Sequence, residues 1–247
     1  MAGHSKWANI KRHKAKQDAK RGKLYTKLIR EVTVSAKISS DPDSNPRLRA
    51  ALDKAQLANM TKDVIDRAVK RGAGGMEGET VEEIRYEGYG PGGIAVMVDC
   101  MTNNRNRTVA DVRHAFTKND GNLGTNGSVA YLFKKLGQLS FEPQQHEEQF
   151  LEFALDAGAD DILLNDDKSI EVLTTPEDFI TIRDKLVHAG FKPKDAEVTM
   201  LAEINVPIAD KEIAEKVVNL IDALEDLDDV QLVYTNADIA SDVLEQM

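Results

Sequence analysis

The 247-residue sequence contains a single cysteine and no long apolar run. Cys100 alone cannot form an internal disulfide or build a thiolate zinc site, which fits a reducing compartment. No apolar stretch approaches the roughly 18 to 20 residues that span a bilayer, so we expect no membrane partner. No apolar segment follows Met1, which argues against a secretory signal peptide. We therefore expect a cytoplasmic protein in which Cys100 is a buried, inert thiol.

The sequence also lacks the motifs that usually indicate an enzyme or a cofactor site. It has no Gly-x-x-x-x-Gly-Lys-Ser/Thr phosphate loop, and its five histidines show no metal-ligand spacing. Gly88-x-Gly90-x-x-Gly93 matches the dinucleotide fingerprint as a string, but a predicted strand follows where a helix is required, so we expect a structural turn. Two acidic pairs are interpreted as solvated turns, Asp166-Asp167 and Asp228-Asp229. We expect no catalytic residues, no metal and no cofactor.

Charge is divided unevenly along the chain. The formal net charge is −10, but residues 1–75 hold 18 Lys and Arg against 7 Asp and Glu, a balance of +11. Residues 76–247 hold 14 basic and 35 acidic residues, a balance of −21. This asymmetry indicates a basic binding module joined to acidic domains. The alternative is that the basic and acidic domains simply attract each other.

The basic charges of the first domain gather on one side of a predicted helix, from about Lys20 to Ile38. Helical spacing forms an apolar stripe from Leu24, Tyr25, Leu28, Ile29, Val32 and Ala36. The opposite side carries Lys16, Lys20, Lys23, Lys27, Arg30 and Lys37. A helix with a buried face and a dense cationic face is suited to tracking phosphates. The candidate nucleic-acid-binding residues of this domain are Lys6, Lys11, Arg12, Lys14, Lys16, Lys20, Lys23, Lys27 and Arg30.

Two further helices are expected in this domain. Asn45 can cap the first, with Pro46 as its first residue, and Thr61 can cap the second. The second helix is expected to end at Gly72, a suitable C′ residue that opens a glycine-rich linker. Trp7 can stack on a base, but we expect it to anchor the N-terminal arm to the helical core.

After the linker the pattern changes to strands. Strands are predicted at Ile84–Glu87, Ile94–Asp99 and Ser128–Phe133, with a helix at Val109–Phe116. From Gln138 the expected order is strand, helix, strand, strand, helix, strand up to Leu201, the βαββαβ order of ferredoxin-like domains. A further strand, an acidic helix and a last strand follow in residues 202–247.

These elements predict an α+β protein of three domains. Residues 1–75 form a basic three-helix domain, and residues 76–136 with 202–247 form an α+β domain. Residues 137–201 form a ferredoxin-like domain inserted into it. The tail is expected to return to the sheet that begins near residue 82, because one helix is too little to cover that sheet.

Two polar loops of the middle region are candidates for phosphate contact. The segment Asn103 to Thr108 lies where a strand ends and a helix begins, so Arg105 and Arg107 would flank the unpaired N–H groups of a helix N-terminus. The alternative is a loop whose Asn or Thr caps the helix while the arginines are solvated. For the glycine-rich segment 121–127 we favour a tight connection that needs positive φ.

Six strings of this sequence resemble the YebC/PmpR family in register over residues 1–133. They are MAGHSKW (1–7), KAKQDAKRGKLYTKLIREV (14–32), NPRLRAALDKA (45–55), YEGYGPGG (86–93), NRNRTVADVRHAF (104–116) and GNLGTNGSVAYLF (121–133). The resemblance implies a helical N-terminal domain followed by two α/β-plait domains, one inserted in the other, and no enzymatic activity. Members of that family are described as DNA-binding transcriptional regulators. It also includes ribosome-associated translation factors, among them a mitochondrial activator of cytochrome oxidase synthesis.

Three hypotheses for function follow. The first is a DNA-binding transcriptional regulator that holds double-stranded DNA through its basic face. The second is a translation factor on ribosomal RNA, whose acidic domains contact ribosomal or other basic proteins. The third is a protein-interaction scaffold without nucleic acid, which the segregation of charge on one helix face disfavours. Because no helix offers an obvious set of base-reading side chains, we expect any DNA binding to be weakly sequence-specific.

Overall fold

The computed structural model describes residues 21–74, 81–165 and 167–247. Contacts divide the chain into two compact units. Among the described residues, the N-terminal unit contains 21–129 and 215–233, and the C-terminal unit contains 130–214 and 234–247. No helix in this part of the chain is long and apolar enough to cross a membrane.

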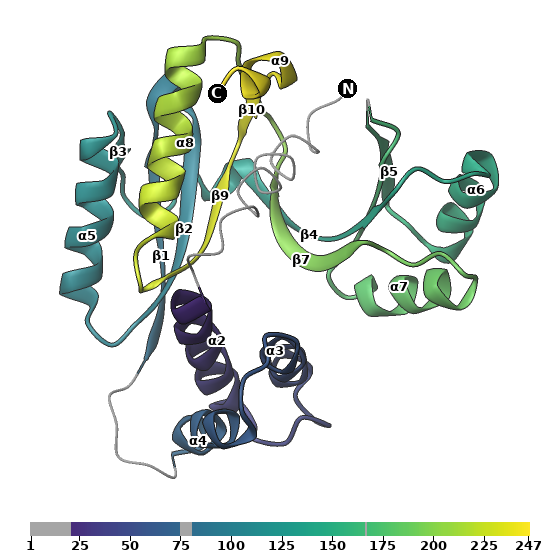
Figure 1. Ribbon diagram of the computed structural model, residues 1–247, viewed down its shortest axis with the longest axis horizontal. Helices are drawn as coiled ribbons and strands as arrows, with labels where there is room; N and C mark the ends of the chain where they lie inside the picture. Colours follow the sequence, from purple (N-terminus) through teal and green to yellow (C-terminus); the bar gives the residue numbers. More distant parts are fainter. Residues whose placement is uncertain (1–20, 75–80, 166) are drawn as a thin grey trace. The chain divides into compact units, whose positions relative to one another are not determined.

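The N-terminal unit begins with three packed helices, α2 (Arg21–Ala36), α3 (Pro46–Leu57) and α4 (Lys62–Gly72) (Figure 1). Their core consists of Leu28, Val32, Ala36, Leu48, Ala51, Ala55, Met60, Ile65 and Ala68. The predicted apolar stripe of α2 is confirmed except at Leu24, which is 47% exposed. Leu24 lies in the first turn of α2, before the turns that contribute to the core.

Asn45 caps α3 as predicted, with Pro46 as the first helical residue. Its side-chain oxygen accepts the Leu48 N–H at 3.1 Å. Its amide nitrogen donates to the carbonyls of Ser35 and Ser39 at 2.8 and 2.7 Å. Asn45 therefore joins the start of α3 to the end of α2. Thr61 occupies the cap position of α4, but its side chain makes no capping hydrogen bond.

Gly72 has a different role from the predicted C′ residue. It is the last residue of α4, and Ala73 follows as the cap. A Cβ at Gly72 would lie 2.2 Å from the Thr33 carbonyl oxygen and 2.7 Å from the Ala36 Cβ. Glycine is required here because α4 packs directly against α2. The left-handed backbone that follows α4 is at Gly74 (φ +78°) and not at Gly72.

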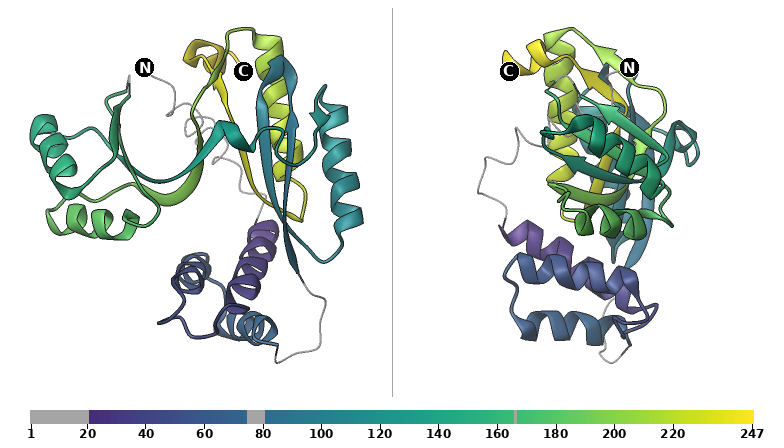
Figure 2. Two further views of the ribbon diagram at one scale, coloured as in Figure 1. Left: turned by 180° about the vertical axis from the view of Figure 1, so that it is seen from behind. Right: turned by 90° about the vertical axis from the view of Figure 1, so that its right-hand side faces the viewer.

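The N-terminal unit continues with a four-stranded sheet of order β3-β1-β2-β9. Its elements are β1 (Glu82–Tyr89), β2 (Ala95–Thr102), α5 (Arg105–Lys118) and β3 (Asn122–Leu123), together with most of α8 (Lys211–Glu225) and of β9 (Val230–Thr235). Figures 1 and 2 show α5 and α8 side by side on one face of this sheet. The tail reaches this sheet through β9, which lies next to β2. Residues 202–214 and 234–247 of the tail belong to the other unit.

The Gly88–Gly93 segment is a structural turn, as expected. β1 and β2 pair in antiparallel register on either side of it. Gly92 and Gly93 have φ of +71° and +76°. A Cβ at Gly88 would lie 2.5 Å from the Asn122 carbonyl oxygen and 2.8 Å from the Phe116 ring. The glycines thus allow the turn and the close approach of β3 and α5.

The predicted strand at 128–133 is wrong. A short 3-10 helix, η2 (Ala130–Leu132), lies there, and β4 begins at Phe133. The carboxylate of Glu87 accepts the N–H groups of Gly127 and Val129, both at 2.8 Å, so these groups bond to a side chain and not to a strand ladder.

The C-terminal unit contains the predicted βαββαβ order. Its elements are β4 (Phe133–Phe141), α6 (Glu147–Ala157), β5 (Asp161–Leu164), β6 (Ile170–Thr174), α7 (Phe179–His188) and β7 (Asp195–Ala202). The strand order β5-β6-β4-β7 is antiparallel throughout, which is the ferredoxin-like arrangement. The unit also holds β8 (Val206–Ile208), β10 (Ala237–Ile239) and α9 (Ser241–Glu245). β8 and β10 pair in parallel.

Candidate nucleic-acid interface

The structure covers part of the predicted basic surface. Trp7 and six of the predicted cations lie outside the described residues, namely Lys6, Lys11, Arg12, Lys14, Lys16 and Lys20. Lys23, Lys27 and Arg30 lie on α2, and each is partly buried. Lys37 is exposed and donates to the Val81 carbonyl at 2.6 Å. Among the described residues, the basic face of α2 therefore consists mainly of Lys23, Lys27 and Arg30.

Lys23, Lys27 and Arg30 all contact the segment of residues 225–229 at the end of α8, which we call the α8 end segment. Lys23 Nζ donates to the Asp226 carbonyl at 2.9 Å and lies 3.5 Å from its carboxylate. Lys27 Nζ donates to the Glu225 carbonyl at 3.3 Å, and Arg30 donates to the Asp228 carbonyl. The last carbonyls of a helix lack helical partners and carry partial negative charge, so they attract cations. Lys23, Lys27 and Arg30 therefore bind an acidic part of the same chain, as in the alternative explanation of the uneven charge.

Asp229 is the centre of this contact. Its expected position in a solvated turn is wrong, because the residue is only 5% exposed. Its carboxylate accepts the hydroxyls of Thr108 and Thr102 at 2.7 and 3.1 Å. Arg107 and Arg30 each reach it at 2.8 Å. A buried carboxylate needs such compensation, since burying a charge without partners is costly.

These contacts also determine the acidity of Asp229. Burial by itself would raise the pKa of the carboxyl. The hydrogen bonds from Arg107 and Thr108, together with the charges of Arg30 and Arg107, outweigh burial and hold the pKa below its ordinary value. Asp229 is therefore ionised at neutral pH, and its single negative charge is shared by two of the predicted nucleic-acid-binding arginines, Arg30 and Arg107.

The start of α5 is arranged as a capped helix. Asn104 is its N-cap and accepts the Arg107 N–H at 3.1 Å, while the Asn104 N–H donates to the Thr102 hydroxyl at 2.9 Å. The side chain of Arg107 is 47% exposed and bound to Asp229. Arg105, in the first turn, is exposed. Of the two predicted arginines, Arg105 therefore presents the more open side chain.

The glycine-rich segment 121–127 is a tight connection, as we favoured. Gly127 has φ of +82°. A Cβ at Gly124 would lie 2.6 Å from the Ser128 hydroxyl oxygen. Glu87, which sequence reasoning did not single out, organises the loop with its buried carboxylate. Its position within an alternating strand gave no signal that its side chain would serve a loop some 40 residues later.

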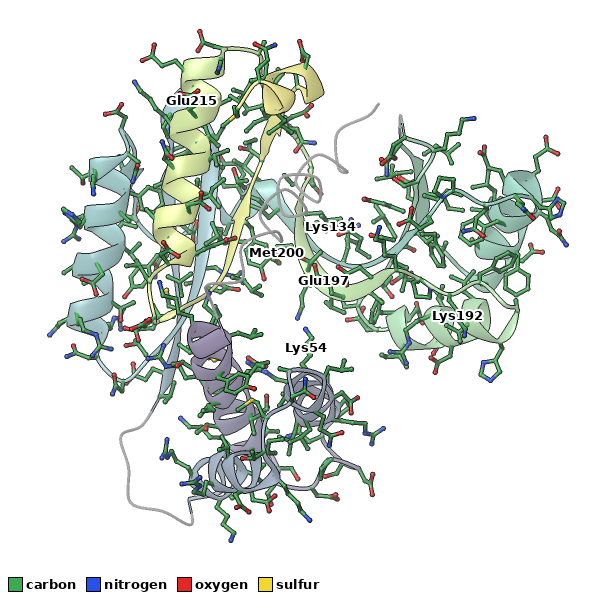
Figure 3. All side chains as sticks on the ribbon, viewed as in Figure 1. Lys54, Lys134, Lys192, Glu197, Met200 and Glu215 are labelled. Carbon is green, nitrogen blue, oxygen red and sulfur yellow. The ribbon has the colours of Figure 1, made fainter. Side chains whose placement is uncertain are left out.

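The helical domain also presents exposed cations that sequence reasoning did not single out. They are Lys54 on α3 and Lys62, Arg67, Lys70 and Arg71 on α4. Figure 3 shows Lys54 projecting from α3. Among the described residues, none of these five forms an ion pair, and Arg67 donates to the Asp63 carbonyl of its own helix. Interspersed aspartates had obscured this cationic surface, which we call the α3–α4 cations.

Cys100 is buried, as expected, and free. Burial, with the nearby charges of Asp229 and Asp99, raises the pKa of its thiol to about 12. A thiol with so high a pKa is protonated at neutral pH and is a poor nucleophile. Among the described residues there is also no group of His, Cys, Asp and Glu side chains that could hold a metal ion.

Comparison with known proteins identifies a common family. A model of the TACO1/YebC protein N-terminal domain matches residues 5–75, and a model of the TACO1/YebC second and third domain matches residues 81–237. A "Probable transcriptional regulatory protein" of Francisella philomiragia is 59% identical over 248 residues, covering 100% of both chains. One of Coxiella burnetii with the same name is 61% identical over 245 residues, covering 99% of this chain and 100% of the relative.

A solved structure is similar over nearly the whole chain. The crystal structure of a conserved hypothetical protein from Aquifex aeolicus superposes with a TM-score of 0.80 at 45% identity. The match covers 92% of this chain and 94% of that one. The helical domain followed by two sheet-containing domains is thus an architecture shared with a known structure.

Proposed function

The chain belongs to the TACO1/YebC family, and on that premise we propose that it is a DNA-binding transcriptional regulator. Relatives about as long as this chain carry the name of probable transcriptional regulatory proteins. The proposal extends that role to double-stranded DNA as the partner. It also assigns the protein to the cytoplasm, with no catalytic activity and no cofactor.

The observation that carries the proposal is the concentration of positive charge in the helical domain. Residues 1–75 have a balance of +11 in a chain whose net charge is −10. In the described part of this domain, the α3–α4 cations are exposed and unpaired with carboxylates. Such a surface releases counterions from a nucleic acid and so gains affinity without reading bases.

The proposed contacts are to phosphates. In addition to the α3–α4 cations, the candidate side chains are Lys6, Lys11, Arg12, Lys14, Lys16, Lys20, Lys23, Lys27, Arg30, Arg105 and Arg107. Arg30 and Arg107 also hold Asp229, so they serve the fold as well as the proposed interface. Phosphate contacts position a protein on DNA but carry little sequence information, and we therefore propose weak sequence specificity.

A second candidate function is that of a translation factor bound to ribosomal RNA. The acidic balance of −21 over residues 76–247 favours it, because an acidic surface complements the basic proteins that accompany ribosomal RNA. The same helical cations would bind phosphates of either nucleic acid, so charge alone does not separate the two functions.

Crosslinking in living cells, followed by sequencing of the recovered nucleic acid, tests the proposal. DNA reads concentrated at promoters are the expected result and would supply the regulated genes. Reads concentrated on ribosomal RNA would replace the first function with the second. Recovery of neither nucleic acid above the level of an uncrosslinked sample would refute both.

A further inference from the structure

We propose that the α8 end segment is an internal competitor that occupies Lys23 and Lys27 until a nucleic acid displaces it. This inference rests on the proposed function and adds a form of regulation to it. The basic face of α2 is suited to phosphates, yet its described cations are already bound within the chain. A nucleic acid that uses them has to exchange protein oxygens for phosphate oxygens.

The α8 end segment presents oxygens much as a phosphate backbone does. Lys23 and Lys27 are one helical turn apart on α2, and their main-chain acceptors belong to the adjacent residues Asp226 and Glu225. The acceptors are main-chain carbonyls at the negative end of α8, close to acidic side chains. Lys23 and Lys27 therefore contact two neighbouring carbonyl oxygens of partial negative charge and one carboxylate.

The contact between α2 and the α8 end segment has two parts. The outer part is formed by Lys23 and Lys27 with residues 225 and 226, and the inner part by Arg30 with Asp229. The side chains of Lys23 and Asp226 are 41% and 49% exposed. Ion pairs this exposed contribute little to stability and are screened by salt. The side chains of Arg30 and Asp229 are 18% and 6% exposed, and Asp229 is also bound by two threonines. When Lys23 and Lys27 are released, the inner contact therefore remains and keeps α2 attached to the α8 end segment.

The acidic side chains of the outer part provide the means to test this inference. Asp226 and Asp228 are both exposed, and neither takes part in the hydrogen bonds around Asp229. The double variant Asp226→Asn/Asp228→Asn would weaken the competitor while the carbonyls and the inner contact remain. We expect it to bind nucleic acid about three- to tenfold more tightly, because it loses the exposed Lys23–Asp226 ion pair and one further negative charge beside it.

A matched control separates this local effect from a change in overall charge. Asp53→Asn/Asp111→Asn also removes two exposed carboxylates of the same unit, on α3 and α5, and neither residue forms an ion pair among the described residues. A third variant adds Lys23→Gln and Lys27→Gln to the double variant and should lose the gain in affinity. Circular dichroism would establish that all variants retain the fold.

The measurement is the dissociation constant of each full-length protein for a short labelled DNA duplex of arbitrary sequence and, in parallel, for a ribosomal RNA fragment. A gain in the double variant that exceeds the control and disappears with the lysines supports the competitor. Binding by the wild-type protein with no gain beyond the control would overturn this inference and leave the proposed function standing. Absence of binding to both probes by every protein would overturn the proposed function, and the competitor with it.

Discussion

The substitution Asp229→Asn should destabilise the N-terminal unit strongly, because one buried carboxylate serves four side chains. Asparagine has nearly the same shape but no charge, so Arg30 and Arg107 would lose their anionic partner. Its amide nitrogen would also replace an oxygen that accepts hydroxyl hydrogens from Thr102 and Thr108. The perturbation is therefore electrostatic and local, with little change in packed volume.

The expected cost is about 2–4 kcal/mol of unfolding free energy. Hydrogen bonds to charged groups contribute about 1.5–3 kcal/mol each, and removal of one partner from a fully buried pair costs about 3–5 kcal/mol. The lower range applies here because the Arg107 side chain is 47% exposed and can recover hydration. Unfolding in urea, followed by circular dichroism, should show a midpoint lower by about 1–2 M for a slope near 2 kcal/mol/M.

The pH dependence gives the same prediction a second readout. The pKa of Asp229 is lower in the folded protein than its ordinary value, so its contribution to stability is present above a pH of about 4. That contribution is lost as pH falls through the folded pKa. The difference in unfolding free energy between wild type and Asp229→Asn should therefore be largest at neutral pH and shrink in acid.

Asp99→Asn is the matched control for Asp229→Asn. Asp99 accepts two hydrogen bonds from Arg85, but the side chains of the pair are 28% and 40% exposed. We expect this variant to lose less than about 1 kcal/mol. A loss in Asp229→Asn no greater than in Asp99→Asn would refute the assignment of Asp229 as the centre of the contact.

Three further predictions concern the helical domain. Gly72→Ala should lower stability by about 1–3 kcal/mol in thermal unfolding, because its Cβ would lie 2.2 Å from the Thr33 carbonyl oxygen; an unchanged melting temperature would show that α2 and α4 separate readily. Asn45→Ala should cost about 1–2 kcal/mol in the same assay, and Asn45→Asp, which keeps the capping oxygen but places a buried carboxylate oxygen against the carbonyls of Ser35 and Ser39, should cost at least as much; a stability equal to that of wild type in both variants would refute the role of Asn45 in joining α2 to α3. Replacing four of the α3–α4 cations, Lys54, Lys62, Lys70 and Arg71, by alanine should reduce the slope of log affinity against log salt for duplex DNA by about 0.9 per lost phosphate contact. A slope equal to that of wild type would remove these side chains from the proposed interface.

Local elements of this protein were predictable from the sequence. The apolar spacing of α2, the Asn45-Pro46 start of α3 and the βαββαβ order of the C-terminal unit all appear in the structure. Each depends on residues near one another in the chain, through helical period, capping chemistry or the alternation of strands. Leu24 was wrongly placed in the core because helical spacing defines a face but not how much of its length is covered.

Only the tertiary structure decided which charges remain available to a partner. The sequence correctly indicated that Lys23, Lys27 and Arg30 share one helix face, but their partners lie about 200 residues further along the chain. Asp229 looked like half of a solvated acidic pair, and it became buried because β9 returns beside β2 and brings it to Arg107 and Thr108. Residue spacing along a helix fixes the direction of a side chain, whereas the return of a distant segment determines what that side chain meets.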